Sequence, residues 1–284
     1  MSVRIGAKVP NSGPLPTEIG IAQMARALEQ AGFESLWVSD HVVLPEQIRS
    51  RYPFAADGKA TWSTSTPYFD AVVALALIAA ATERAAFGTA VLVLPLRNAV
   101  VFAKQAASLD VVSGGRLKLG LGAGWLAEEF AALGVPFESR GSRFEEALGT
   151  LRAAWTGRLP GGVLAVPTPA HDIPVLVGGH AAPALRRAGG IGDGWLGQQS
   201  LDAIDTAEIE AARAAIESAA RDAGREPAAL QVVLRIVDTA GRSDEVARQL
   251  PALAAAGVDE VIVDVDWSGG DHAADFERLA GAVA

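Results

Sequence analysis

Hydrophobic residues along this chain fall into two alternating kinds of segment, short apolar runs and longer amphipathic stretches. Short runs rich in aliphatic residues predict buried strands, whereas apolar residues spaced three and four apart predict helices. The predicted strands cover residues 4–10, 33–38, 86–94, 116–122, 173–179, 194–197, 231–237 and 260–265. The helices predicted between and after them cover residues 17–31, 68–82, 100–112, 142–155, 183–188, 201–223, 244–256 and 271–283.

This alternation predicts a parallel sheet, because parallel strands need a helical crossover between them. Such units close into a (β/α)8 TIM barrel, whose strands are apolar on both faces. An open, doubly wound sheet is the competing fold. We expect residues 1–284 to form one barrel domain, with a long loop at 42–67 after the second strand and an insertion at 126–157 between the fourth and fifth strands. A loop of that length is typical of a functional lid.

The segment GGRLKLGLGAGW, which ends the fourth strand, carries glycines at every second position: Gly120, Gly122 and Gly124. Residues at this spacing share one face of a strand, and glycine there packs nothing. A bulge or a tight barrel corner explains any one of them. Three in register predict that a flat ligand approaches the backbone. The dinucleotide fingerprint G-x-G-x-x-G does not match, because its third glycine is absent.

Chemistry in a barrel is expected where strands end. Asp40 and His41 follow the second strand, and a histidine can exchange a proton near neutral pH. Adjacent residues of an extended chain point to opposite sides, so these two side chains need not touch. An aspartate that caps the loop and a histidine that fills the rim are the alternative interpretation.

A second strand end carries Gly178, Gly179 and His180, shortly before a helix that starts near Pro183. Backbone N–H groups of such a turn, together with a helix N-terminus, favour an anion. An ordinary turn between strand and helix explains the same residues.

Composition narrows the classes of partner. The chain has 24 basic and 33 acidic residues, a net charge of −9, and no basic patch, so we expect neither nucleic acid nor an anionic membrane surface as a partner. It has no cysteine, hence no disulfide or thiolate metal site. Without an H-x-H pair or clustered carboxylates, we expect no metal. No apolar run reaches the roughly 18 residues of a membrane span, which favours a cytoplasmic protein.

Four segments together resemble a known family. FESLWVSDH (33–41), the stretch 88–125, FEEALGTLRAAW (144–155) and PVLVGGHAAPALRRAGGIGDGW (174–195) are similar to the luciferase-like monooxygenase superfamily. Within it they most resemble the branch of F420-dependent oxidoreductases. The resemblance extends over most of residues 3–200.

The resemblance implies a (β/α)8 barrel that binds a flavin or deazaflavin ring over the strand ends, usually as a homodimer. Asp40 matches the position that contacts the ring, and His41 matches the proposed acid/base. Ala90-Val91 falls where deazaflavin enzymes carry a non-proline cis peptide against the ring. Gly178 and Gly179 match the phosphate-binding end of the fifth strand.

Two departures concern the substrate. Leu44-Pro45 stands where relatives that oxidise sugar phosphates have a tryptophan, and Trp125 stands where they have a carboxylate. Both argue against a sugar-phosphate substrate.

We therefore expect an oxidoreductase that transfers a hydride between coenzyme F420 and a small organic substrate, with His41 handling the proton. We expect Gly120, Gly122, Gly124 and His180 to join Ala90-Val91 and Gly178-Gly179 in binding the cofactor. The alternative is an FMN-dependent monooxygenase that uses O2 and a separate cofactor reductase. A second alternative is a barrel that binds a flavin or deazaflavin without catalysis.

Overall fold

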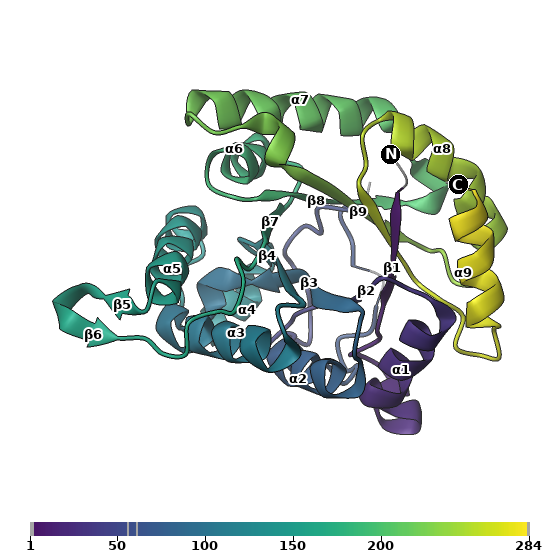
Figure 1. Cartoon of the computed structure of the whole chain (residues 1–284), viewed down its shortest axis with the longest axis horizontal. Coiled ribbons are helices and arrows are strands. Elements are labelled where there is room, and N and C mark those ends of the chain that lie inside the picture. The colour runs from purple at the N-terminus through teal and green to yellow at the C-terminus, as the bar shows by residue number, and fades with distance from the viewer. Residues whose placement is uncertain (1–2, 56, 61, 283–284) are drawn as a thin grey trace.

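The chain folds into a closed barrel of parallel strands with helices packed around it (Figure 1), as a computed structural model of residues 3–55, 57–60 and 62–282 shows. Around the barrel the strands follow the order β1-β10-β9-β8-β7-β4-β3-β2. Each barrel pair is parallel, so all the strands end on the same side. The predicted (β/α)8 TIM barrel is confirmed.

The observed elements lie close to the predicted ones. The barrel strands are β1 (Arg4–Lys8), β2 (Ser35–Val38), β3 (Ala86–Val93), β4 (Leu117–Gly122), β7 (Val175–Gly178), β8 (Gly194–Ser200), β9 (Gln231–Val237) and β10 (Glu260–Val263). The α-helices are α1 (Ile21–Ala31), α2 (Ala71–Ala81), α3 (Ala99–Ser113), α4 (Ala127–Ala132), α5 (Arg140–Trp155), α6 (Ala182–Gly190), α7 (Thr206–Asp222), α8 (Ser243–Ala255) and α9 (His272–Gly281).

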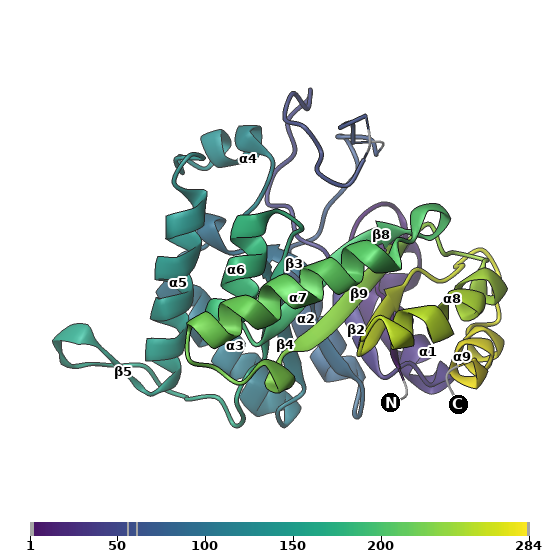
Figure 2. The same ribbon diagram turned by 90° about the horizontal axis from the view of Figure 1, so that it is seen from above.

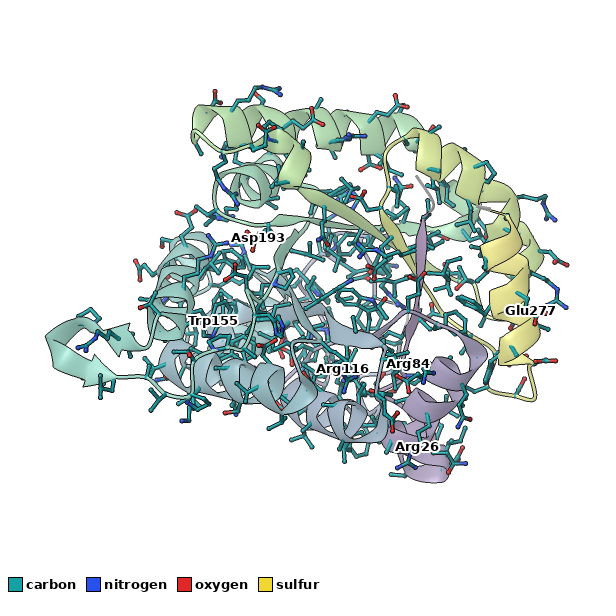
Figure 3. The ribbon with its side chains drawn as sticks, viewed as in Figure 1. Arg26, Arg84, Arg116, Trp155, Asp193 and Glu277 are labelled. Atoms are coloured by element: carbon teal, nitrogen blue, oxygen red, sulfur yellow. The ribbon has the colours of Figure 1, made fainter. Side chains whose placement is uncertain are left out.

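Side-chain caps fix where several helices begin. Asp70 accepts hydrogen bonds from the first N–H groups of α2, Asn98 does the same for α3, and Asp205 for α7. The cap at Asp205 explains why α7 starts later than the predicted residue 201. At the other end of the barrel, Arg116 (labelled in Figure 3) donates to backbone carbonyls of Ala79, Thr82 and Ala85 and so joins the end of α2 to β3.

The barrel interior is filled in layers. Nearest the amino ends of the strands, buried Glu260 accepts hydrogen bonds from Ser35 Oγ at 2.5 Å and Lys118 Nζ at 2.8 Å. An apolar layer follows, made of Trp37, Ala90, Leu176, Leu196, Val233 and Ile262. Because these two layers close the barrel from below, a ligand can enter only from the carboxyl ends of the strands.

The insertion between β4 and β7 holds more structure than predicted. Besides α5 it contains the short helix α4 and a two-stranded hairpin, β5 (Arg158–Leu159) and β6 (Val163–Leu164). Figure 2 shows α4 and the loop between β2 and α2 projecting from one end of the barrel, with both chain termini at the other. Among the described residues, no helix has the length and apolar character needed to cross a membrane.

Candidate functional site

A cavity of about 1420 Å³ opens where the barrel strands end. Binding pockets for small molecules commonly have roughly 300–1,000 Å³, so this one has room for a cofactor and a substrate together. Its wall includes nearly all of the predicted site residues: Asp40, His41, Ala90, Val91, Gly122, Gly124, Gly178, Gly179 and His180.

His41 faces this cavity with its ring held from behind by a carboxylate. Nδ1 of His41 lies 3.0 Å from Oε2 of Glu129, a residue of α4 that is 1% exposed. The other oxygen of Glu129 accepts hydrogen bonds from the backbone N–H groups of Val42 and Val43, at 2.6 and 3.3 Å. With Nδ1 turned to the carboxylate, Nε2 is the ring nitrogen available to a ligand.

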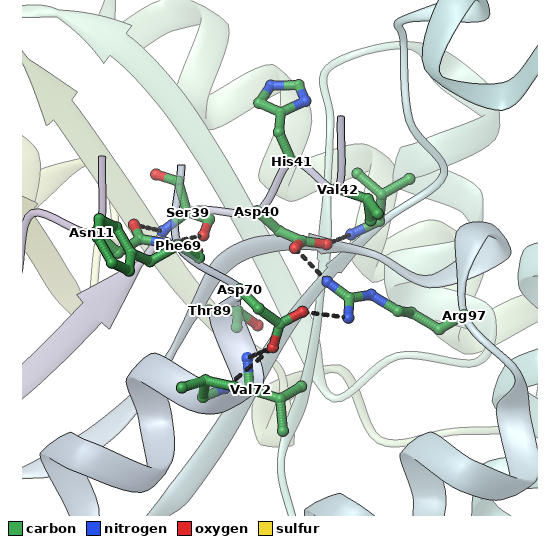
Figure 4. Close-up of polar contacts among 12 residues, drawn as sticks. Asn11, Ser39, Asp40, His41, Val42, Phe69, Asp70, Val72, Thr89 and Arg97 are labelled. Carbon is green, nitrogen blue, oxygen red and sulfur yellow. Dashed lines mark hydrogen bonds and ion pairs between the residues drawn. The ribbon is translucent and has the colours of Figure 1, made fainter. Parts of the chain in front are cut away.

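Asp40 points away from His41, as Figure 4 shows. Its carboxylate is buried and accepts hydrogen bonds from Nη2 of Arg97 at 2.5 Å and from the N–H of Val93 at 3.1 Å. Nη1 of Arg97 donates to Asp70 at 2.7 Å, which links this group to the cap of α2. Burial raises the pKa of Asp40 above its usual value, against the opposing effect of the Arg97 charge. The carboxylate beside His41 is therefore Glu129 and not the adjacent Asp40.

The peptide bond between Ala90 and Val91 is cis, at the position that the family resemblance indicated. The side chain of Val91 then lies over two glycines. A Cβ atom added to Gly122 would come within 2.8 Å of one Val91 methyl group, and one added to Gly178 within 2.7 Å of the other. These two glycines leave the room that Val91 needs to line the cavity.

The interpretation of three glycines facing a flat ligand is wrong for Gly120. A Cβ atom there would lie 2.1 Å from the carbonyl oxygen of Thr89 and 2.8 Å from Leu196, so the glycine permits the close packing of β4 against β3. Gly120 does not line the cavity. Gly124 lies beyond the strand with φ of 87°, packed against Phe130 and Val93. Only part of the glycine pattern therefore belongs to the cavity.

The turn after β7 leads directly into α6. Gly179 has φ of 121°, a conformation that favours glycine, and Pro183 occupies the first turn of the helix. His180 accepts a hydrogen bond from the N–H of Gln198 through Nε2 at 3.0 Å, which leaves Nδ1 to donate to Glu208 at 2.8 Å. Both ring nitrogens of His180 are thus used within the protein.

Aromatic side chains cover the cavity from the loop after β2. Tyr52 packs edge-on against Trp62 and Trp125, with ring centroids 5.0 and 5.1 Å apart. Its hydroxyl accepts a hydrogen bond from Gln198 Nε2 at 3.1 Å, which ties the loop to β8. Burial raises the pKa of Tyr52, so this hydroxyl stays neutral. The other side of the loop is held by Glu128, which accepts from the N–H groups of Arg49 and Ser50 at 2.6 and 3.0 Å.

The sequence did not predict that three charged residues lie together in the cavity wall. Lys8 ends β1, Arg235 lies in β9, and Asp264 follows β10. Arg235 interrupts the otherwise apolar run VVLRIV, and a single charge in such a strand could have indicated a residue of the cavity. Glu129 was missed as well, because nothing in the local pattern of α4 relates it to residue 41. Among the described residues, no group of three or more His, Cys, Asp or Glu side chains is arranged to hold a metal ion.

Fold and cavity together define a (β/α)8 barrel with its candidate active site at the carboxyl ends of the strands. The family description of luciferase-like monooxygenases matches residues 8–282, and the chain belongs to this family. The expected family and the expectation of an enzyme are confirmed.

The chain is also similar to individual proteins of known sequence or structure. An uncharacterised protein of Mycobacterium tuberculosis is 37% identical over 183 residues, which are 61% of this chain and 63% of that protein's length. The F420-dependent glucose-6-phosphate dehydrogenase of Beutenbergia cavernae is 33% identical over 181 residues, 59% of this chain and 49% of that enzyme. A solved F420-dependent secondary alcohol dehydrogenase, in complex with an F420-acetone adduct, superposes on the whole chain with a TM-score of 0.78 and 17% identity, and each chain is covered completely. At that identity the superposition shows the fold alone.

Proposed function

We propose that this protein is an F420-dependent oxidoreductase that acts on a small organic substrate. The observation that carries the proposal is the placement of His41. A proton-exchanging ring faces a cavity large enough for cofactor and substrate, and a buried carboxylate fixes its orientation. One relative named above, the glucose-6-phosphate dehydrogenase, is F420-dependent by name, which favours the deazaflavin over FMN.

The wall of the cavity fits a flat ring with an anionic tail. Ala90, Val91 and Gly122 would support the ring, since the two glycines under Val91 carry no side chain into that space. Gly178 and Gly179 would hold the phosphate with the N-terminus of α6, where backbone N–H groups favour negative charge. Arg187 of α6 also lines the cavity and pairs with Glu145 at 2.7 Å. When bound, F420 supplies the carbon that accepts or donates the hydride.

The chain's own residues then manage the proton. Glu129 holds Nδ1 of His41 as the donor of their hydrogen bond, so Nε2 is free to accept a proton from a substrate hydroxyl or to return one to a carbonyl oxygen. The aromatic side chains of the loop after β2 exclude water from that exchange. Asp40 would act through position, because its bonds to Arg97 and Val93 fix the backbone from which His41 projects.

We also propose that the protein is a homodimer. Support comes from apolar side chains exposed on the outer faces of neighbouring helices α2 and α3, among them Val73, Leu77, Val101 and Val112. Light scattering should give a mass twice that of one chain. A monomer at all concentrations would contradict this.

The proposed activity is tested by following the F420 chromophore with a panel of small alcohols, aldehydes and unsaturated carbonyl compounds. Turnover should require F420, and His41→Ala should lower kcat by about 100-fold or more while the Kd for F420 changes little. Oxygen-dependent turnover with reduced FMN and a separate reductase would overturn the proposal in favour of the monooxygenase. Tight binding without turnover on any substrate would favour a carrier.

A further inference from the structure

Two cations in the cavity wall lack a full set of partners. Lys8 is 9% exposed and Arg235 8% exposed, and side chains of these types are almost never so buried without being paired. Nη2 of Arg235 donates to both carboxylate oxygens of Asp264, at 2.9 and 3.1 Å. Its buried Nη1 has no hydrogen-bond partner, and no described residue forms a hydrogen bond or ion pair with Nζ of Lys8.

The charge of this group does not balance. Lys8 and Arg235 supply two positive charges when both are protonated, whereas Asp264 supplies one negative charge. Burial, with Arg235 as the next contribution, lowers the pKa of Lys8 to about 7. An anion in front of these two side chains would restore the charged form and satisfy the unused N–H groups.

The barrel topology separates Lys8 from the predicted phosphate turn. In the closed order β1-β10-β9-β8-β7-β4-β3-β2, β1 with Lys8 lies four strands from β7 with Gly178, which is the opposite side of the barrel, and β9 with Arg235 lies two strands from β7. By contrast, β1 is the direct neighbour of β2, the strand that leads to His41. An anion at Lys8 and Arg235 would therefore sit on the substrate side of the cavity.

The wall of the same cavity around His41 is aromatic. Tyr68 and Trp125 both pack edge-on against His41, with ring centroids 5.4 and 6.1 Å from that of the histidine. Tyr52 and Trp62 complete this wall. Such a surface suits an apolar body attached to the anionic group.

We propose that Lys8 and Arg235 form an oxyanion-binding subsite and that the substrate is a small carboxylate with an apolar body. The carboxylate would bind between Nζ of Lys8 and Nη1 of Arg235, and its apolar part would lie against the aromatic wall. The reacting oxygen would then point to His41. This inference rests on the proposed function in assigning the opposite side of the cavity to the cofactor.

The test compares benzoate with benzamide, two probes of the same shape that differ in charge. Their binding is measured by calorimetry at pH 6.5, with the cofactor-free protein and with the F420-saturated protein. The variants are Lys8→Met and Lys8→Gln, with Lys104→Met as the control, because Lys104 is exposed on the outer helix α3. Wild type and Lys104→Met should prefer benzoate by about tenfold or more, and both Lys8 variants should lose this preference. The Kd for F420 should stay unchanged in all of them.

The outcomes separate this inference from the proposed function. Equal binding of benzoate and benzamide by the wild type, with F420 bound and turned over, would overturn the subsite and leave the function standing. Selective benzoate binding that disappears at Lys8, without any F420 binding, would support the subsite and contradict the function. A Lys8 variant that weakens F420 and spares benzoate would assign the two cations to the cofactor and so overturn the inference.

Discussion

Glu129 and His41 are 88 positions apart in the chain, yet Oε2 of the one lies 3.0 Å from Nδ1 of the other. The same carboxylate anchors the start of the loop after β2 through the N–H groups of Val42 and Val43. The orientation of the histidine and the position of the loop thus depend on one buried side chain.

Replacing Glu129 with glutamine should therefore reduce catalysis more than cofactor binding. The amide oxygen can still accept from the N–H groups of Val42 and Val43, but the NH2 group then faces Nδ1 of His41 and cannot accept its proton as the carboxylate does. We expect kcat to fall by about 10- to 100-fold, as for other residues that orient a functional histidine, with the Kd for F420 nearly unchanged. Steady-state kinetics and a binding titration check this.

Glu128→Gln is the matched comparison, because Glu128 holds the backbone at Arg49 and Ser50 and makes no contact with His41. Its effect on kcat should be smaller. If the two variants lose the same activity, Glu129 acts through the loop alone.

The buried group of Asp40, Arg97 and Asp70 should show strong coupling. Arg97→Met leaves the carboxylate of Asp40 buried without its cation, which should reduce the free energy of unfolding by about 3–5 kcal/mol. Adding Asp40→Asn removes that unpaired charge, so the double variant should recover part of the loss. Urea denaturation of the single and double variants measures the coupling. Strictly additive losses would show that the two residues are independent.

Gly120 provides a test of the corrected glycine interpretation. An alanine there would place its Cβ atom 2.1 Å from a backbone oxygen, and we expect a loss of about 1–3 kcal/mol of stability. Gly149 in α5 has nothing within 4 Å of an added Cβ atom, so Gly149→Ala should gain about 0.5–1 kcal/mol. Thermal and urea denaturation compare the two. A neutral Gly120→Ala that weakens cofactor binding would restore the ligand-facing interpretation.

Lys8 should make the free energy of unfolding depend on pH. Its pKa is lowered from 10.5 to about 7 in the folded protein, chiefly by burial, and near it lie the charges of Arg235 and Asp264. Between these two pH values the unfolded chain binds one proton more than the folded protein, so stability rises with pH above 7. The slope contributed by Lys8 is at most about 1.4 kcal/mol per pH unit. Lys8→Met should remove this contribution in urea denaturation at pH 7.5 and 9; an unchanged slope would contradict it.

The fold was predictable because each strand and each helix carries its own hydrophobic pattern in the sequence. The apolar run AVLV in β3 and the glycine at position 114 that ends α3 can both be identified from neighbouring residues in the sequence. The same holds for Asp40 and His41, whose place at a strand end follows from the strand itself. Features that depend on contacts across the barrel were not predictable, because no local pattern encodes them. Glu129 reaches His41 from another unit, and Gly120 is required by Thr89 of the neighbouring strand.

Lys8 and Arg235 illustrate the same limit at the cavity. Arg235 appears in the sequence as one charge in an apolar strand, and Lys8 alternates with apolar residues in a strand that also holds Arg4. Both patterns are compatible with a surface position at the strand end. Their nearness to Asp264 arises because β1, β10 and β9 are adjacent in the closed barrel. The order of strands around the barrel, and not the order along the chain, defines this site.

The most direct test of the central claim is a side-by-side equilibrium titration of the purified protein with F420 and FMN, followed by fluorescence. We predict that F420 binds with a Kd at least about tenfold lower than that of FMN, a difference of about 1.4 kcal/mol. Tighter binding of FMN, or no binding of either compound, would contradict the assignment of this cavity to a deazaflavin.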